Sequence, residues 1–245
     1  MIEALDHIVL RTADAGSALA SYEAVLGRRA AGTRLQLSNM ALEFTAANPT
    51  APSAELGLMF AVGDLPAAVH RLERRAIACA PPHDGRVLLD TAATHEVAIG
   101  LVALKERRAD SGTSSDILGL DHVVVRTRDP ERSVALYGGR LGLDLRLDRT
   151  NPERGNRLLF FVCGDLVVEI SHDTGKGVRP GPDGIWGLAW RSADVRGSHA
   201  RLQAAGITVS EIRTGNRPGT EVFTVKTHTA SVPTLVIGGQ GLARK

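Results

Sequence analysis

Short apolar runs alternate along this chain with longer stretches in which apolar residues recur at helical spacing. The run 5–12, Leu-Asp-His-Ile-Val-Leu-Arg-Thr, is apolar through its middle and predicts a buried strand. The stretch 15–26 that follows predicts a helix, and strand-like runs return at 34–37 and 39–44. This order predicts a βαβββ module, which belongs to the α+β class.

The same module returns later in the chain. The run 120–127 repeats 5–12 at an offset of 115 positions, with only Ile/Val and Leu/Val exchanges. In both copies an aspartate stands where a helix N-cap is expected, a tyrosine lies within the helix and a glycine marks its end. These residues are Asp14, Tyr22 and Gly27 in the first copy and Asp129, Tyr137 and Gly142 in the second. The agreement of all three features indicates a true repeat.

Weaker copies of the pattern complete each half of the chain. They open on the apolar runs 58–64 and 188–194, and each continues with a helical stretch and a closing extended run. These later elements are 65–76 and 94–104 in the first half, and 195–205 and 229–237 in the second. The chain is therefore predicted to hold four modules in two domains, residues 1–104 and 118–245, joined by a polar linker at 105–117.

Composition narrows the classes of protein that remain. Apolar residues make up 43% of the chain and charged residues 23%, and no apolar run approaches the length of a membrane span. A formal charge of +2 with scattered basic residues argues against nucleic acid as a partner. The start of the chain lacks signal-peptide features, and Cys79 and Cys163 lie in different halves without CxxC spacing. We therefore expect a cytoplasmic protein with reduced thiols whose partner is a small molecule.

The motifs of the repeat resemble those of the vicinal oxygen chelate superfamily. This superfamily includes glyoxalase I, extradiol ring-cleavage dioxygenases, fosfomycin-resistance enzymes and bleomycin-resistance proteins. The resemblance is carried by Leu-Asp-His at two strand openings, Tyr-x3-Leu-Gly at two helix ends, Leu-Glu-Phe and Val-Glu-Ile in later strands, and Ala-Asp-Val before the fourth helix. It implies two cupped mixed β-sheets with helices outside. It implies little about the reaction, because members of this fold run unrelated chemistries and some only bind.

In metal-using members a divalent ion (Fe, Mn, Ni or Zn) is held by a His from the first strand and a Glu from the fourth strand of each of two modules. The resemblance places two such pairs here, His7 with Glu43 and His122 with Glu169. The matching positions of the second and fourth modules are Gly57, Gly100, Gly187 and Leu235. Each half then offers two ligands, fewer than the three or so that hold a catalytic ion. Glu96 is the one carboxylate expected on the ligand-bearing face of a partner strand.

Three roles therefore stay open for each His–Glu pair. It forms part of an incomplete metal site, it acts as an acid–base pair in which the carboxylate fixes the imidazole tautomer, or it is structural. Arg126 shares a strand face with His122, and Arg191 shares one with Gly187, so these arginines are candidates to hold a carboxylate or phenolate. The alternative is that both arginines lie at a solvated rim.

The remaining candidate residues are expected to pack in the core, to connect modules or to lie at the surface. Trp186 and Trp190 fall on the opposite parity from Gly187, which predicts that they pack against a helix. The loop 175–182 is predicted to connect the third and fourth modules and to be placed where it can act as a lid. Three histidines at strand ends are predicted to be surface residues; these are His95, His172 and His228.

Two classes of function follow. The first is an enzyme of the lyase, isomerase or dioxygenase type, acting on a small oxygenated or aromatic molecule with His122, Glu169, Arg126 and Arg191 as catalytic residues. The second is a metal-free binding protein of the bleomycin-resistance type that sequesters its ligand. The incomplete ligand set disfavours a glutathione-dependent glyoxalase I and an extradiol dioxygenase. Pairing of modules within one chain, or between two chains of a homodimer, stays open.

Overall fold

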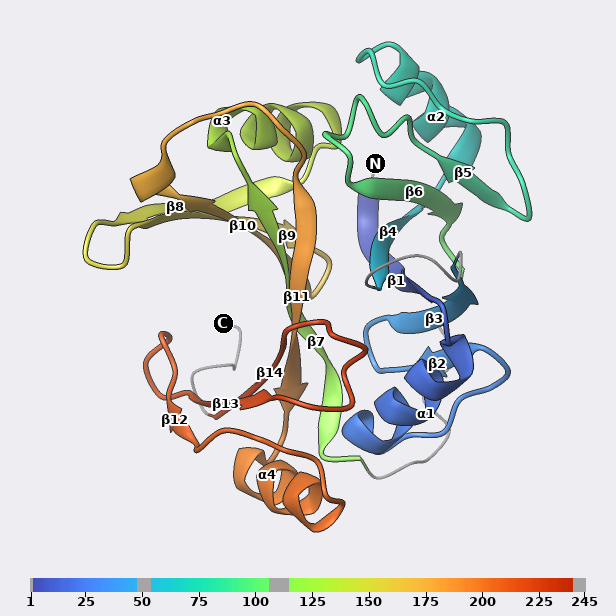
Figure 1. Cartoon of the computed structure of the whole chain (residues 1–245). Coiled ribbons are helices and arrows are strands. Elements are labelled where there is room, and N and C mark those ends of the chain that lie inside the picture. The colour runs from blue at the N-terminus through green and yellow to red at the C-terminus, as the bar shows by residue number, and fades with distance from the viewer. Residues whose placement is uncertain (1, 48–53, 106–114, 240–245) are drawn as a thin grey trace. The chain divides into compact units, whose positions relative to one another are not determined.

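A computed structural model describes residues 2–47, 54–105 and 115–239 (Figure 1). The elements of the first half are β1 (Ile2–Thr12), α1 (Ala15–Leu26), β2 (Arg34–Gln36), β3 (Ala41–Ala46), β4 (Glu55–Val62), α2 (Leu65–Glu73), β5 (Arg86–Leu88) and β6 (Ala98–Ala103). Those of the third module are β7 (Ile117–Thr127), α3 (Pro130–Ser133), the π-helix η1 (Val134–Arg140), β8 (Asp144–Asn151), β9 (Asn156–Cys163) and β10 (Leu166–Asp173). The short 3-10 helix η2 (Thr174–Lys176) leads to β11 (Gly184–Ser192), α4 (Val195–Ala204), β12 (Arg213–Thr214), β13 (Glu221–Val225) and β14 (Thr234–Gly238).

The strands form two mixed sheets. The order is β2-β3-β1-β4-β6-β5 in one and β12-β13-β14-β11-β7-β10-β9-β8 in the other. Within a module the first strand runs parallel to the last, as β7 does with β10 and β11 with β14. In the first two modules two named strands follow the helix, and isolated bridges such as Ala31–Arg34 and Cys79–Leu89 stand beside them. The α+β fold of repeated βαβββ modules is as predicted.

The chain divides into two compact units, and each unit contains strands from both sheets. The first comprises Met1–Ile8, Leu56–Arg107 and His122–Trp186, which is mainly the second and third modules. The second comprises Val9–Glu55, Arg108–Asp121 and Gly187–Lys245, mainly the first and fourth. The domain boundaries at 1–104 and 118–245 stay a prediction, and residues 106–114 of the predicted linker lie outside the described residues.

The helix ends follow the predicted capping residues. The Asp14 carboxylate accepts a hydrogen bond from the Ser17 amide at 2.8 Å, and Gly27 ends α1 with a left-handed φ of 64°. The helix of the third module departs from the prediction, since it is α-helical only to Ser133 and continues as η1 to Arg140. The adjacent glycines 138 and 139 lie in η1 and weaken an α-helix at this point.

Two closing strands are shorter than predicted. β6 begins at Ala98 because His95 and Glu96 adopt left-handed φ angles of 57° and 70°, which end the extended backbone. A similar turn with positive φ precedes β14. The expectation that Glu96 lies on the face of Gly100 was therefore wrong, because Glu96 lies in a turn and is exposed to solvent. No helix in the described part of the chain is long and apolar enough to cross a bilayer.

Candidate functional site

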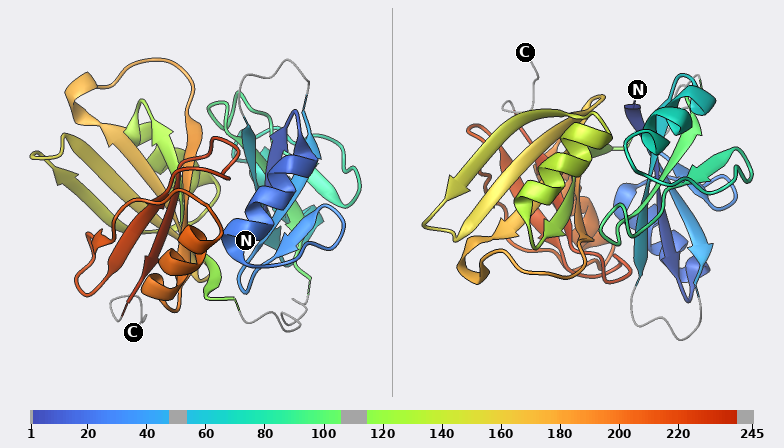
Figure 2. Two further views of the ribbon diagram at one scale, coloured as in Figure 1. Left: turned by 60° about the horizontal axis from the view of Figure 1, so that its bottom comes forward. Right: turned by 90° about the horizontal axis from the view of Figure 1, so that it is seen from above.

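Strands β7, β9 and β10 of the third module expose two unlike faces. Helices α3 and η1 cover one face of these strands (Figures 1 and 2), and the side chains on that face are fully buried. These core residues are Val123, Val125, Leu159, Phe161, Val168 and Ile170. Because side chains alternate along each strand, the neighbouring positions point to the opposite face. The register aligns Val167 with His122, Glu169 with Val124 and with Phe160, and Ser171 with Arg126.

We name this opposite face the His122 face. It consists of His122, Val124 and Arg126 from β7, Leu158, Phe160 and Val162 from β9, and Val167, Glu169 and Ser171 from β10. All but Val124 are at least partly exposed. The face therefore combines an apolar floor with four polar side chains, which is the composition expected of a small-molecule site.

His122 and Glu169 come together on this face. The imidazole Nε2 lies 3.8 Å from a carboxylate oxygen of Glu169, and the two side chains are 17% and 16% exposed. That distance is too long for a hydrogen bond and short enough for an ion pair once the ring is protonated. The pair is thus sheltered by its surroundings yet open to a ligand.

The first module's pair has partners of its own. His7 is buried, and its Nδ1 lies 2.6 Å from the carboxylate of the neighbouring Asp6. A carboxylate oxygen of Glu43 lies 3.6 Å from the guanidinium of Arg34. His7 belongs to the first compact unit and Glu43 to the second.

The two candidate arginines have unlike surroundings. The guanidinium carbon of Arg126 lies 4.1 Å from the centre of the Trp186 ring. Arg191 lies in the other compact unit, with its Nε 3.6 Å from a carboxylate oxygen of Asp121. Asp121 is buried, and its second oxygen lies 3.9 Å from Arg217. Arg191 therefore neighbours an acid that sequence reasoning missed, although this Asp directly precedes His122 in the Leu-Asp-His motif.

The two tryptophans differ from each other. Trp190 packs as predicted, fully buried and edge-on to Tyr22 of α1 with 6.5 Å between ring centres. Trp186 was predicted wrongly, since it is 42% exposed and carries Arg126 on its ring. It lies near the beginning of β11, where alternation does not require burial on either side.

Two of the three strand-end histidines also depart from the prediction. His172 is buried, with its Nδ1 3.3 Å from the Thr127 carbonyl oxygen. His95 is partly buried, and its burial together with the nearby Arg132 guanidinium lowers the pKa of its imidazole. Only His228 is exposed as expected.

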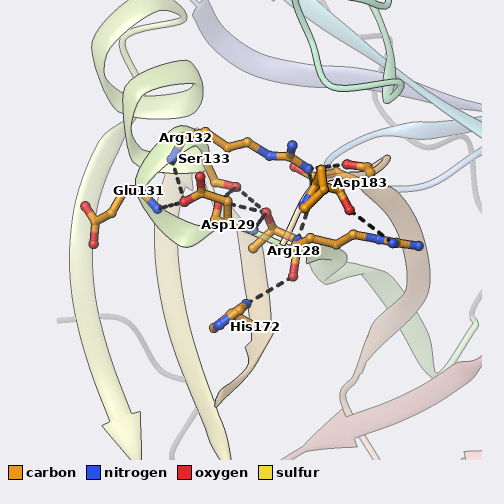
Figure 3. A network of polar contacts seen from close by, with 10 residues as sticks. Arg128, Asp129, Glu131, Arg132, Ser133, His172 and Asp183 are labelled. Atoms are coloured by element: carbon orange, nitrogen blue, oxygen red, sulfur yellow. Dashed lines mark hydrogen bonds and ion pairs between the residues drawn. The ribbon is translucent and has the colours of Figure 1, made fainter. Parts of the chain in front are cut away.

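Two arginines hold the connection between the third and fourth modules. Arg132 donates to the Gly181 carbonyl at 2.7 Å and to the Asp183 carboxylate at 2.5 Å, while Arg128 donates to the Pro180 carbonyl at 3.2 Å (Figure 3). The same Asp183 oxygen accepts the Arg128 amide at 3.2 Å. The loop predicted as a lid is therefore tethered to the start of α3 at residues 180–183.

The positions that lack metal ligands are filled by other atoms. A Cβ on Gly100 would lie 2.6 Å from Met59 Cε, and one on Gly187 would lie 2.7 Å from the Pro233 carbonyl oxygen. Among the described residues, no group of three or more His, Cys, Asp or Glu side chains could hold a metal ion. The residues present therefore do not fit the four-ligand centre that the resemblance implied.

A surface hollow of about 460 Å³ lies in the fourth module. Its lining includes Arg196 and Glu221, which pair with each other, together with His199, Glu211 and Arg213. None of the predicted site residues lines it.

Comparison with known proteins agrees with the resemblance. Residues 119–228 match the family model described as the Glyoxalase/Bleomycin resistance protein/Dioxygenase superfamily. A search of the curated proteins finds no match.

Solved structures cover nearly the whole chain. A mutant of 4-hydroxymandelate synthase from Streptomyces coelicolor is 15% identical over 100% of this chain and 94% of its own, with a TM-score of 0.76. The 2,2',3-trihydroxybiphenyl 1,2-dioxygenase of Sphingomonas wittichii strain RW1 is 17% identical over 98% of this chain and 90% of its own, with a TM-score of 0.70. A halotolerant catechol dioxygenase is 13% identical over 98% and 87%, also with a TM-score of 0.70. At such identities the likeness shows the fold, which is the one predicted.

Proposed function

We propose that this chain, whose residues 119–228 match the family model of the Glyoxalase/Bleomycin resistance protein/Dioxygenase superfamily, acts on a small oxygenated or aromatic molecule at the His122 face. The observation that carries the proposal is the separation of 3.8 Å between His122 Nε2 and Glu169, both sheltered on a face with an apolar floor. His7, by contrast, is buried with its Nδ1 2.6 Å from the Asp6 carboxylate, so it is less accessible to a ligand than His122.

The chemistry proposed for this pair is proton transfer. A neutral His122 takes a proton from a carbon or hydroxyl of the ligand, and Glu169 stabilises the imidazolium that forms. The same imidazolium returns the proton at another position or to water. The apolar neighbours Val124 and Phe160 exclude part of the solvent, which strengthens the charge interaction between the two residues.

A divalent ion held by His122, Glu169 and solvent is a competing role for the same two side chains. Such a site has two protein ligands, and at Gly187, where the resemblance places a ligand of the partner module, an added Cβ would lie 2.7 Å from the Pro233 carbonyl oxygen. This close approach favours the metal-free roles of the face. It is also the specific observation that supports the second candidate function, a binding protein that sequesters its ligand without chemistry.

Two measurements on the same variants separate these functions. Elemental analysis of protein purified without chelator is compared for the wild type, His122→Ala and Glu169→Gln, with His228→Ala as the exposed control. We expect no stoichiometric metal in any of them. Metal that disappears only from the two site variants would establish the metal role instead.

The second measurement follows proton exchange. A panel of small aromatic and oxygenated acids is incubated with the protein in D2O, and loss of carbon-bound protons is followed by NMR. An acid–base enzyme exchanges at least one panel member, and the exchange is lost in His122→Ala and Glu169→Gln but kept in His228→Ala. Binding of panel members without exchange or turnover in the wild type would instead support sequestration.

A further inference from the structure

Trp186 is a large aromatic side chain left partly in solvent beside the His122 face. Its 42% exposure contrasts with Trp190, which is fully buried. The Arg126 guanidinium covers the Trp186 ring at 4.1 Å, a distance typical of a cation–π contact. Stacking fixes the plane of the guanidinium while its N–H groups point outward along the edge.

Three other arginines of this module have acidic partners. Arg132 pairs with Asp183, Arg146 with Asp144, and Arg157 with both Asp148 and Glu131. The guanidinium of Arg126 contacts the Trp186 ring. Among the described residues it forms no ion pair and no hydrogen bond. A guanidinium that is held in place without an acidic partner is suited to bind a carboxylate of a ligand, because it can donate to both carboxylate oxygens at once.

The position of Arg126 on β7 sets its distance from the proposed reaction site. Arg126 and His122 lie four residues apart on β7 and share a face, so their Cα atoms are about 13 Å apart at roughly 3.3 Å per residue. Val124 lies between them, and the adjacent strand brings Glu169 beside it. Side chains stand roughly perpendicular to a strand, so a span of this order separates the two polar groups, and an extended planar molecule with one or two rings matches it.

We propose that Arg126, stacked on Trp186, is the subsite for the carboxylate of an extended planar organic acid whose other end reaches His122 and Glu169. This inference deepens the proposed function and rests on it for the second half of the statement. The carboxylate subsite itself stands on Arg126 and Trp186 alone.

The test uses trans-cinnamate and its neutral analogue trans-cinnamamide as probes. The chain has two tryptophans, so a ¹H–¹⁵N correlation spectrum shows two indole signals, which Trp186→Phe assigns. We expect cinnamate to shift the Trp186 signal saturably and to leave the buried Trp190 signal in place. Cinnamamide should bind at least about 10-fold more weakly, because it loses a charge-assisted contact.

Variants locate the subsite. They also separate a result that contradicts the subsite from one that contradicts the proposed proton transfer at His122. Arg126→Gln should abolish the preference for cinnamate, and Arg126→Lys should retain part of it. The control Arg196→Gln changes an exposed arginine of the fourth module and should bind cinnamate within about twofold of the wild type. Equal affinity for both probes, or a cinnamate shift that survives Arg126→Gln, overturns the subsite. Proton exchange that persists while cinnamate fails to bind at Arg126 also overturns the subsite and leaves the function of His122 intact.

Discussion

The two tyrosines of the chain give a matched test of the packing of the repeat. Tyr22 and Tyr137 occupy equivalent places in the first and third modules, and both side chains are fully buried. The Tyr22 hydroxyl donates to the Thr229 carbonyl at 3.3 Å, whereas the Tyr137 hydroxyl has no hydrogen-bond partner among the described residues. Burial raises the pKa of both phenols, so both are neutral at ordinary pH.

Replacing each tyrosine by phenylalanine should therefore change the free energy of unfolding in opposite directions. A buried hydrogen bond contributes about 0.5–1.5 kcal/mol net, and the long Tyr22 bond belongs near the lower end of that range. The Thr229 carbonyl keeps a second donor, the Val232 amide at 2.9 Å, so Tyr22→Phe leaves no unpaired group. An unpaired buried hydroxyl costs about 1–3 kcal/mol, and Tyr137→Phe removes it. We expect a loss of about 0.5–1 kcal/mol for Tyr22→Phe and a gain of about 1 kcal/mol for Tyr137→Phe.

Urea unfolding followed by circular dichroism and tryptophan fluorescence measures both changes. Tyr22 and Tyr137 belong to different compact units, so if unfolding shows two transitions, each variant should shift its own. A destabilisation of Tyr137→Phe equal to that of Tyr22→Phe would refute the reasoning, because it would show that the Tyr137 hydroxyl has a partner.

Three further predictions concern other parts of the fold. Trp190→Ala should destabilise the protein by about 3–5 kcal/mol in urea unfolding, because it empties a fully buried aromatic position; a cost below 1 kcal/mol would mean that the site is not packed. The lowered pKa of His95 means that the folded protein disfavours the charged ring, so its contribution to stability is complete above the unfolded pKa of about 6.5 and is lost as pH falls from there through the lower folded pKa. His95→Gln should flatten this part of the stability profile between about pH 5 and 7, and an unchanged slope would assign it to other groups. Gly187→Ala should cost about 1–3 kcal/mol, because its Cβ would lie 2.7 Å from the Pro233 carbonyl; an unchanged urea midpoint would show that this backbone moves freely.

Much of the secondary structure of the third module could be predicted from local sequence signals. The run 120–127, the N-cap Asp129 and the terminal Gly142 together predicted a strand followed by a helical segment, because each signal is local, but not the change from α- to π-helix after Ser133. The placing of His122 and Glu169 on one face came from the family resemblance, and alternation along each strand is consistent with it. The predictions that were wrong also have physical reasons. A tryptophan near the beginning of a strand has no required side, so parity could not say that Trp186 would remain exposed beneath an arginine.

Other features depended on residues far apart in the chain. The acid that neighbours Arg191 is Asp121, and their contact requires two strands from different modules to be placed beside each other. The burial of His172 depends on β10 lying beside β7, where the Thr127 carbonyl meets its ring. Left-handed residues such as Glu96 end a strand through backbone angles that an apolar pattern does not reveal.

The sequence by itself determined the repeat, the α+β class and the residue types at each ligand position, because these follow from local periodicity and from aligned motifs. The tertiary structure alone decided that Gly100 and Gly187 are packed by Met59 and Pro233. It also decided which arginine has an acidic neighbour and which is stacked on an indole. These outcomes depend on where side chains from separate strands end in space, and one-dimensional spacing carries no such distances.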